Sequence, residues 1–250
     1  MDFEHELAHH LIDHKLFHFM VGPLDLGLSP LILTMWAACA FLVVSLSLGA
    51  RADKSFSRSV MEPLVLYVRD EMVEPIFGHH TDIYLPYFLT LFFFLLTCNF
   101  FGLIPGASGV TANIAVTASL AICTFLLMQF AGIKEQGLGA YLAHIVPSGV
   151  PWWLWPLLFV IEVFGMAAKC ISLCIRLFAN MLAGHVVVLS FISLIFIFAE
   201  MSHVAGYGVS PAAVGLALFI MLMDVLVSVL QAYIFTFLTI LFVGSSVHPH

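Results

Sequence analysis

Long apolar runs dominate the chain, and polar residues interrupt them at only a few places. A helix needs about 20 apolar residues, at a rise of about 1.5 Å each, to cross a hydrocarbon core of about 30 Å. The pattern therefore predicts five membrane-embedded helices, at residues 26–50, 84–104, 111–132, 154–200 and 211–243.

Two pairs of these helices are expected to form hairpins. Pro105-Gly106 and the small polar residues after it divide an uncharged run, which predicts a helical hairpin over residues 84–132. The last two helices are unusually long, and the Gly, Ser and Pro residues at 206–211 separate them. We therefore expect a long, tilted hairpin over residues 154–243.

Charged residues give the orientation of these helices. The basic residues gather between the first and second helices and after the third, at Arg51, Lys54, Arg58, Arg69 and Lys134. The positive-inside tendency places these loops on the cytoplasmic side. Residues 1–25 then form an outer segment, and the carboxy terminus lies inside.

The segment 59–77 between the first two helices has an amphipathic pattern. Apolar Val60, Leu64, Tyr67 or Val68, and Met72 recur at helical spacing opposite Arg69, Asp70 and Glu74. This pattern predicts an interfacial amphipathic helix, with a plain linker as the alternative.

Composition excludes a soluble globular protein. The 250 residues are 62% hydrophobic and 9% charged, and the formal net charge is -7. The eight basic residues do not form the stripe that a nucleic-acid binder needs, so no nucleic-acid partner is expected. All five cysteines lie in apolar runs, where sulfur behaves as a buried hydrophobe. The expected fold is an all-α membrane protein with a single membrane domain over residues 1–250, without disulfides, cofactor or metal.

The outer segment contains a match to a metalloprotease signature. His5-Glu6-Leu7-Ala8-His9 fits H-E-x-x-H, which places two imidazoles and a glutamate on one helical face around zinc. No packed scaffold precedes the match, a catalytic zinc needs a third ligand, and histidines crowd this stretch by composition. A solvated outer segment is the preferred interpretation over a zinc hydrolase.

Ionisable residues inside the apolar helices are the strongest functional signal, because each costs about 2.5–3.5 kcal/mol at the bilayer centre. Arg176 lies more than ten residues from either end of its helix and cannot lose its proton. At 100° per residue, the polar residues of this helix fall within about 80° of one another. They are Glu162, Lys169, Ser172, Arg176 and Asn180. Nearby alanines would let another helix approach this face, and an ordinary packing stripe is the alternative.

A second polar group is expected where the two long helices face each other. In an antiparallel hairpin His185 falls level with Asp224, and Arg176 falls close to Gln231. Asp224, Ser228 and Gln231 share one helical face. These residues can line a wet path from the outer surface to Arg176, and a second path would begin at Glu162, about 21 Å toward the inner side. A permanent cation between two such half-paths lets protons reach the middle from either face but blocks leakage. A structural His–Asp hydrogen bond without a transport role is the alternative.

Several motifs of the chain point to one known family. The segment from Ser172 to His185 (SLCIRLFANMLAGH) is similar to the signature of subunit a of the F-type ATP synthase. Asn99-Phe-Phe-Gly-Leu-Ile-Pro105 is similar to its N-x-x-G-L-x-P hairpin, and residues 111–117 continue the match. Asp224 followed by Gln231-Ala-Tyr-Ile-Phe235 is similar to its last helix. Many members exchange the acid and the histidine that stand here at Asp224 and His185.

The resemblance implies a non-catalytic, proton-translocating stator subunit of the Fo sector. Arg176 would face the carboxylates of a rotating c-ring. Asn180, His185, Asp224 and Gln231 would belong to the outer half-channel, and Glu162 and Ser172 would lie toward the inner one. The implied partners are the c-ring, the peripheral-stalk b subunits, other ATP synthase subunits, lipid and protons.

A secondary transporter is the main rival, and it would predict inverted repeats, which the sequence does not display. A bacterial inner membrane is the expected location because no transit peptide precedes the first helix, with the mitochondrial inner membrane as the alternative.

Overall fold

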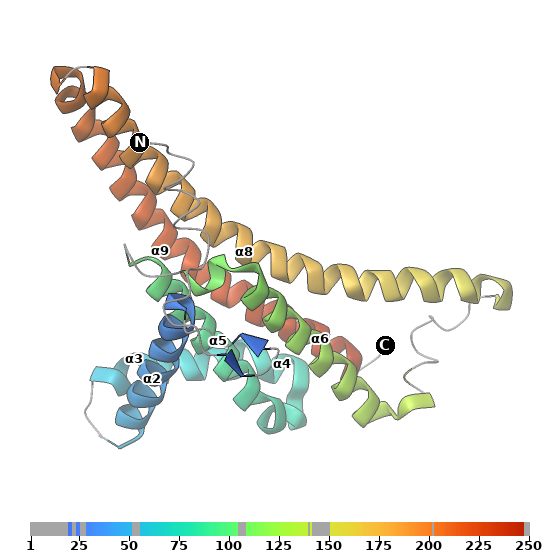
Figure 1. Ribbon diagram of the computed structural model, residues 1–250. Coiled ribbons are helices and arrows are strands. Elements are labelled where there is room, and N and C mark those ends of the chain that lie inside the picture. Colours follow the sequence, from blue (N-terminus) through green and yellow to red (C-terminus); the bar gives the residue numbers. More distant parts are fainter. Residues whose placement is uncertain are drawn as a thin grey trace. The chain divides into compact units, whose positions relative to one another are not determined.

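The computed structural model describes residues 20–21, 24–25, 29–51, 56–104, 109–139, 141, 151–201 and 203–247 (Figure 1). The first long helices are α2 (Pro30–Arg51), α5 (Thr81–Gly102) and α6 (Ile114–Gln136). The last two are α8 (Trp155–Met201) and α9 (His203–Val247). Among these residues, five helices are long and apolar enough to cross a membrane. The prediction of an all-α membrane protein with five membrane-embedded helices is therefore confirmed.

Short elements complete the described chain. Strands β1 (Met20–Val21) and β2 (Leu24–Asp25) pair antiparallel, and the sequence pattern did not predict them. The 3-10 turns are η2 (Gly78–His80), η3 (Val110–Ala112) and η4 (Trp152–Leu154).

The segment expected to be amphipathic is helical, but its geometry changes along its length. Helix α3 (Phe56–Tyr67) continues into a π-helical stretch, η1 (Val68–Val73), and then into α4 (Glu74–Phe77). Val68, Met72 and Val73 are buried, whereas Arg69, on the polar side, is exposed. Tyr67 is exposed too. Of the two alternatives, Val68 rather than Tyr67 therefore belongs to the buried apolar side.

The break expected at residues 206–211 was wrong. Helix α9 begins at His203 and continues through Gly206, Gly208 and Pro211. Glycine and proline interrupt helices less in membrane segments than in water. In a bilayer, main-chain N–H and C=O groups have no water as a hydrogen-bond partner, so the helix is maintained. Pro211 removes a single N–H donor and leaves the rest of the helical ladder intact.

The chain divides into two compact units. Unit 1 comprises Met1–Leu48, Phe93–Asn113 and Phe178–Ala232, and unit 2 comprises Gly49–Phe92, Ile114–Leu177 and Tyr233–His250. In unit 1, Leu95 and Cys98 of α5 are fully buried. In unit 2, the buried ring of Phe77 contacts Tyr84 at 4.9 Å and Phe88 at 5.6 Å. Each unit therefore has its own packed interior.

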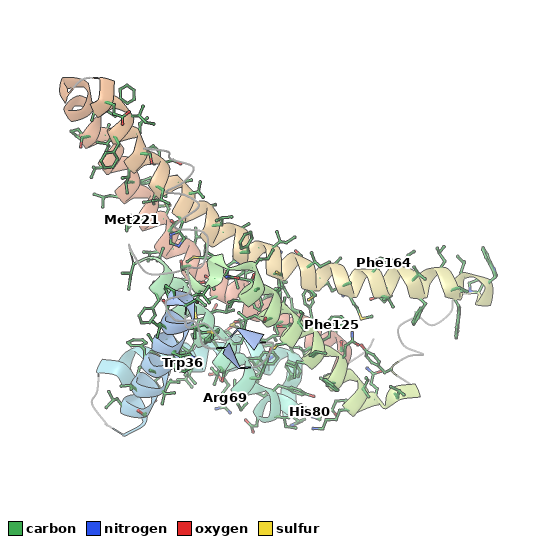
Figure 2. All side chains as sticks on the ribbon, in the orientation of Figure 1. Trp36, Arg69, His80, Phe125, Phe164 and Met221 are labelled. Atoms are coloured by element: carbon green, nitrogen blue, oxygen red, sulfur yellow. The ribbon has the colours of Figure 1, made fainter. Side chains whose placement is uncertain are left out.

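Large apolar side chains also cover much of the outer surface. Figure 2 shows Phe164 standing out from α8, where 71% of this residue is exposed, and Trp36 on α2 is 63% exposed. Such surface is costly in water and neutral in lipid, so these faces suit a bilayer.

A close contact in unit 2 gives a first prediction. A methyl group added at Gly244 of α9 would clash with Cγ2 of Ile76. We expect Gly244→Ala to destabilise unit 2 by about 1–3 kcal/mol, the usual cost of overpacking. Thermal unfolding of the purified complex checks this. Gly244→Ala/Ile76→Ala should recover most of the loss, and a double variant as unstable as the single one would contradict this packing.

Candidate functional site

His185 and Asp224 come together in unit 1, where α8 and α9 run side by side (Figure 1). Gly184 makes the approach possible, because a Cβ atom at this position would lie 2.5 Å from Oδ2 of Asp224. His185 and Asp224 are half-buried and interact electrostatically. An imidazole and a carboxylate in this arrangement can exchange a proton near neutral pH.

The turn between α5 and α6 contributes a wall beside the imidazole. A Cβ atom at Gly109 would lie 2.8 Å from Nε2 of His185. The main chain at Gly109 therefore packs against the ring, and a larger residue would displace it. Gly109 does not stand out in the sequence, because a glycine beside a turn carries no signal of its own.

A buried polar cluster lies in the same unit. Asn99, near the end of α5, donates a hydrogen bond from Nδ2 to the main-chain oxygen of Ser228, at 3.2 Å. Thr111 of η3 donates from Oγ1 to Oδ1 of Asn99, at 3.0 Å. Asn99 and Thr111 are fully buried, and Ser228 is 1% exposed. In the sequence Asn99 stands out only as part of a family motif, and its hydrogen bond to Ser228 was not predicted.

In unit 1, two polar atoms of α9 are buried with unused hydrogen-bonding capacity. Among the described residues, neither Oγ of Ser228 nor Nε2 of Gln231 has a hydrogen-bond partner. Gln231 is 5% exposed. An unsatisfied buried polar atom costs about 1–3 kcal/mol, so groups of this kind usually hold ordered water. Asn180 of α8 is half-buried in the same unit.

Arg176 lies in unit 2 and is exposed. Ser172, one turn earlier on α8, is exposed as well, and so is Glu162. No described acid of unit 2 forms an ion pair with Arg176. The structure does not bring Glu162 to Arg176, because fourteen residues of one helix separate them. The arginine therefore presents its charge on an uncovered face of its unit.

Lys169 has a different environment from Arg176, although the two share a helical face. Its Nζ lies 5.4 Å from the centroid of the Phe242 ring, in a cation–π contact between α8 and α9. The lysine is half-buried and lines a small cavity with Met166 and Cys170. The ring of Phe242 thus stabilises the charge of Lys169, and no described residue of unit 2 makes a comparable contact with Arg176.

The zinc signature at residues 5–9 lies outside the described residues. The Pro105-Gly106 turn of the hairpin lies outside them too.

An all-α membrane chain with ionisable residues inside its apolar helices is typical of ion-translocating membrane proteins. Residues 32–244 match the family model described as the ATP synthase A chain. The chain is 38% identical to "ATP synthase subunit a" of Chloroherpeton thalassium, over 97% of this chain and 76% of that protein. It is 40% identical to "ATP synthase subunit a" of Myxococcus xanthus, over 92% of this chain and 77% of that protein. A third relative, "ATP synthase subunit a 2" of Chlorobaculum tepidum, is 37% identical, over 95% of this chain and 71% of that protein.

The chain therefore belongs to the ATP synthase subunit a family. It is an integral membrane protein of the Fo sector and serves ion transport and ATP synthesis within a complex with other subunits. This membership decides against a separate secondary transporter.

Proposed function

We propose that this chain is the stator of a proton-driven rotary motor and makes no bond in ATP itself. Two proton half-channels would enter from opposite membrane faces, and Arg176 would separate them. The proposal covers residues 1–250 as a single membrane domain, with the amino terminus outside and the carboxy terminus inside a bacterial inner membrane.

The exposure of Arg176 is the observation that carries this proposal. A guanidinium stays charged, so it needs a carboxylate or water when it lies deep in an apolar helix. No described acid of its own unit pairs with it, and this supports the proposal that another subunit brings one. A ring of c subunits, each with a carboxylate in the membrane, would supply these acids in turn. Peripheral-stalk b subunits would hold the chain stationary.

Neighbouring small residues leave room for the ring. In unit 2, Ala168 and Ser172 are exposed on α8, and in unit 1 Ala179 and Ala183 are exposed. Small side chains let a second helix approach closely. Each passing carboxylate would stay ionised opposite Arg176 because opposite charges attract strongly where water is scarce.

The proton path would have an outer and an inner part. His185 and Asp224 would receive a proton from the outside and pass it, through the region of Gln231 and Asn180, to a ring carboxylate. Glu162 and Ser172 would lie along the exit to the inner side. The electrostatic interaction between His185 and Asp224 supports the outer part. Both residues can bind or release a proton, as a relay requires.

Disulfide cross-linking tests the position of the ring. The five native cysteines, Cys39, Cys98, Cys123, Cys170 and Cys174, would first be replaced. Ser172→Cys should then cross-link to a cysteine placed beside the ring carboxylate, because a disulfide needs Cβ atoms within about 4.5 Å. Gel analysis of oxidised membranes gives the yield.

Ile171→Cys is the matched control. Ile171 is adjacent in sequence and 56% exposed, but it points about 100° away around the helix. We expect a higher yield at Ser172 than at Ile171. Equal yields, or a higher yield at Ile171, would place the ring on another face of α8 and contradict the proposal.

A further inference from the structure

The Asn99 side chain joins three segments of unit 1 that are distant in sequence. It belongs to the last turns of α5, accepts a hydrogen bond from Thr111 of η3, and donates one to the main chain of α9 at Ser228. One amide thus uses both of its ends on defined partners. Because the group is fully buried, water cannot replace either bond without a rearrangement.

The bond to Ser228 acts on the middle of a helix. Ser228 is well inside α9, so its main-chain oxygen already serves the helical ladder. A further donor on that oxygen fixes the rotation of α9 and its position along its axis. Asp224 lies one turn before this point, and Gln231 lies about one turn after it.

The same turn of α9 holds the unsatisfied polar atoms. Oγ of Ser228 and Nε2 of Gln231 are buried and have no partner among the described residues. Water or a proton relay can bind these two atoms only if this face of α9 points in the right direction. A rotation of α9 would point these atoms in another direction and would move Asp224 relative to His185.

We infer that Asn99 is a positioning residue for the outer proton path, and that Thr111 holds its amide in the required orientation. The pair sets the rotation of α9 and thereby the alignment of Asp224, Ser228 and Gln231. This inference rests on the proposed function, because it assigns Asn99 to the path that enters past His185 and Asp224.

Four variants of the chain, within the whole ATP synthase complex in membrane vesicles, test the inference. Asn99→Ala removes both bonds, and Thr111→Val removes one hydroxyl at nearly constant volume. Thr111→Ser keeps the hydroxyl. Thr239→Val is the matched control, because Thr239 is also fully buried but donates only within α9, to the main-chain oxygen of Phe235 at 2.8 Å.

The rate of ATP synthesis under an imposed proton gradient would be measured per amount of assembled chain. We expect Asn99→Ala and Thr111→Val to lower it about tenfold, as the loss of a buried hydrogen bond implies. Thr111→Ser and Thr239→Val should remain within about twofold of the parent chain. Thr111→Val at the parent rate would overturn the inference. If Asn99→Ala does not assemble into the complex, the rate of Thr111→Val alone tests the inference.

A solvent isotope comparison separates positioning from mere loss of structure. Slower proton transfer should raise the ratio of the rates in H2O and D2O for Asn99→Ala and Thr111→Val. A purely structural defect reduces the number of active complexes and leaves this ratio unchanged, which would overturn the inference. Arg176→Ala, assayed in parallel, keeps the two proposals distinct. If it is inactive while Thr111→Val is normal, only the role of Asn99 fails. An active Arg176→Ala would refute the proposed function itself.

Discussion

Arg176→Ala should lower proton-driven ATP synthesis by about 10² to 10⁴-fold. The loss of one partner from a desolvated ion pair costs about 3–5 kcal/mol, and each 1.36 kcal/mol corresponds to a tenfold change in rate. Without the guanidinium, a ring carboxylate would have no cation to hold it ionised, and protons could pass directly between the half-channels. The measurement is the rate of ATP synthesis by the whole complex in vesicles under an imposed proton gradient.

Arg69→Ala provides the control for a lost arginine. Arg69 is exposed, and its side chain approaches Asp70 at 3.9 Å. Surface pairs contribute about 0–1 kcal/mol, so this variant should retain most of the activity. ATP synthesis at the parent rate by Arg176→Ala would refute the role assigned to Arg176.

Gly184→Ala should give the second largest effect, a loss of activity of about tenfold or more. The added methyl group would lie 2.5 Å from Oδ2 of Asp224, so the carboxylate or α9 must move. Overpacking costs about 1–3 kcal/mol, and here the displacement falls on the pair of Asp224 and His185. The same synthesis assay measures the effect, normalised to the amount of chain in the membrane.

Gly215→Ala is the matched control for this substitution. Gly215 is also helical and belongs to the same unit, but a Cβ atom there meets no atom within 4 Å. We expect normal activity, with no loss of assembly. Normal activity in Gly184→Ala as well would mean that the distance between α8 and α9 at Asp224 has no influence on proton transfer.

The lengths of the uncharged apolar runs were sufficient to predict the long helices. Each of the five predicted spans corresponds to a helix, because a bilayer demands an uninterrupted apolar length and satisfied main-chain groups. The boundary at residues 206–211 failed for the same reason, since glycine and proline rules reflect helices in water. The strands at β1 and β2 are too short to produce a pattern.

The site was partly accessible from the sequence. Arg176, His185 and Asp224 stand out because ionisable groups are rare in apolar helices. Asn99 and Thr111 do not stand out, because neutral polar residues are common at helix ends and only the fold joins them to Ser228. The sequence also did not reveal that Lys169 and Arg176 have different surroundings. The two share a helical face, and only the position of Phe242 distinguishes them.

The π-helical stretch at Val68–Val73 has a consequence for comparing members of the family. A π turn is equivalent to one extra residue inserted into an α-helix. A chain that lacks either Arg69 or Asp70 would return to regular α geometry there and keep Val68, Met72 and Val73 on the buried side. A deletion in the α-helical turn before it would instead rotate everything downstream by about 100°. Alignments of subunit a sequences should therefore place single-residue gaps within this stretch rather than beside it.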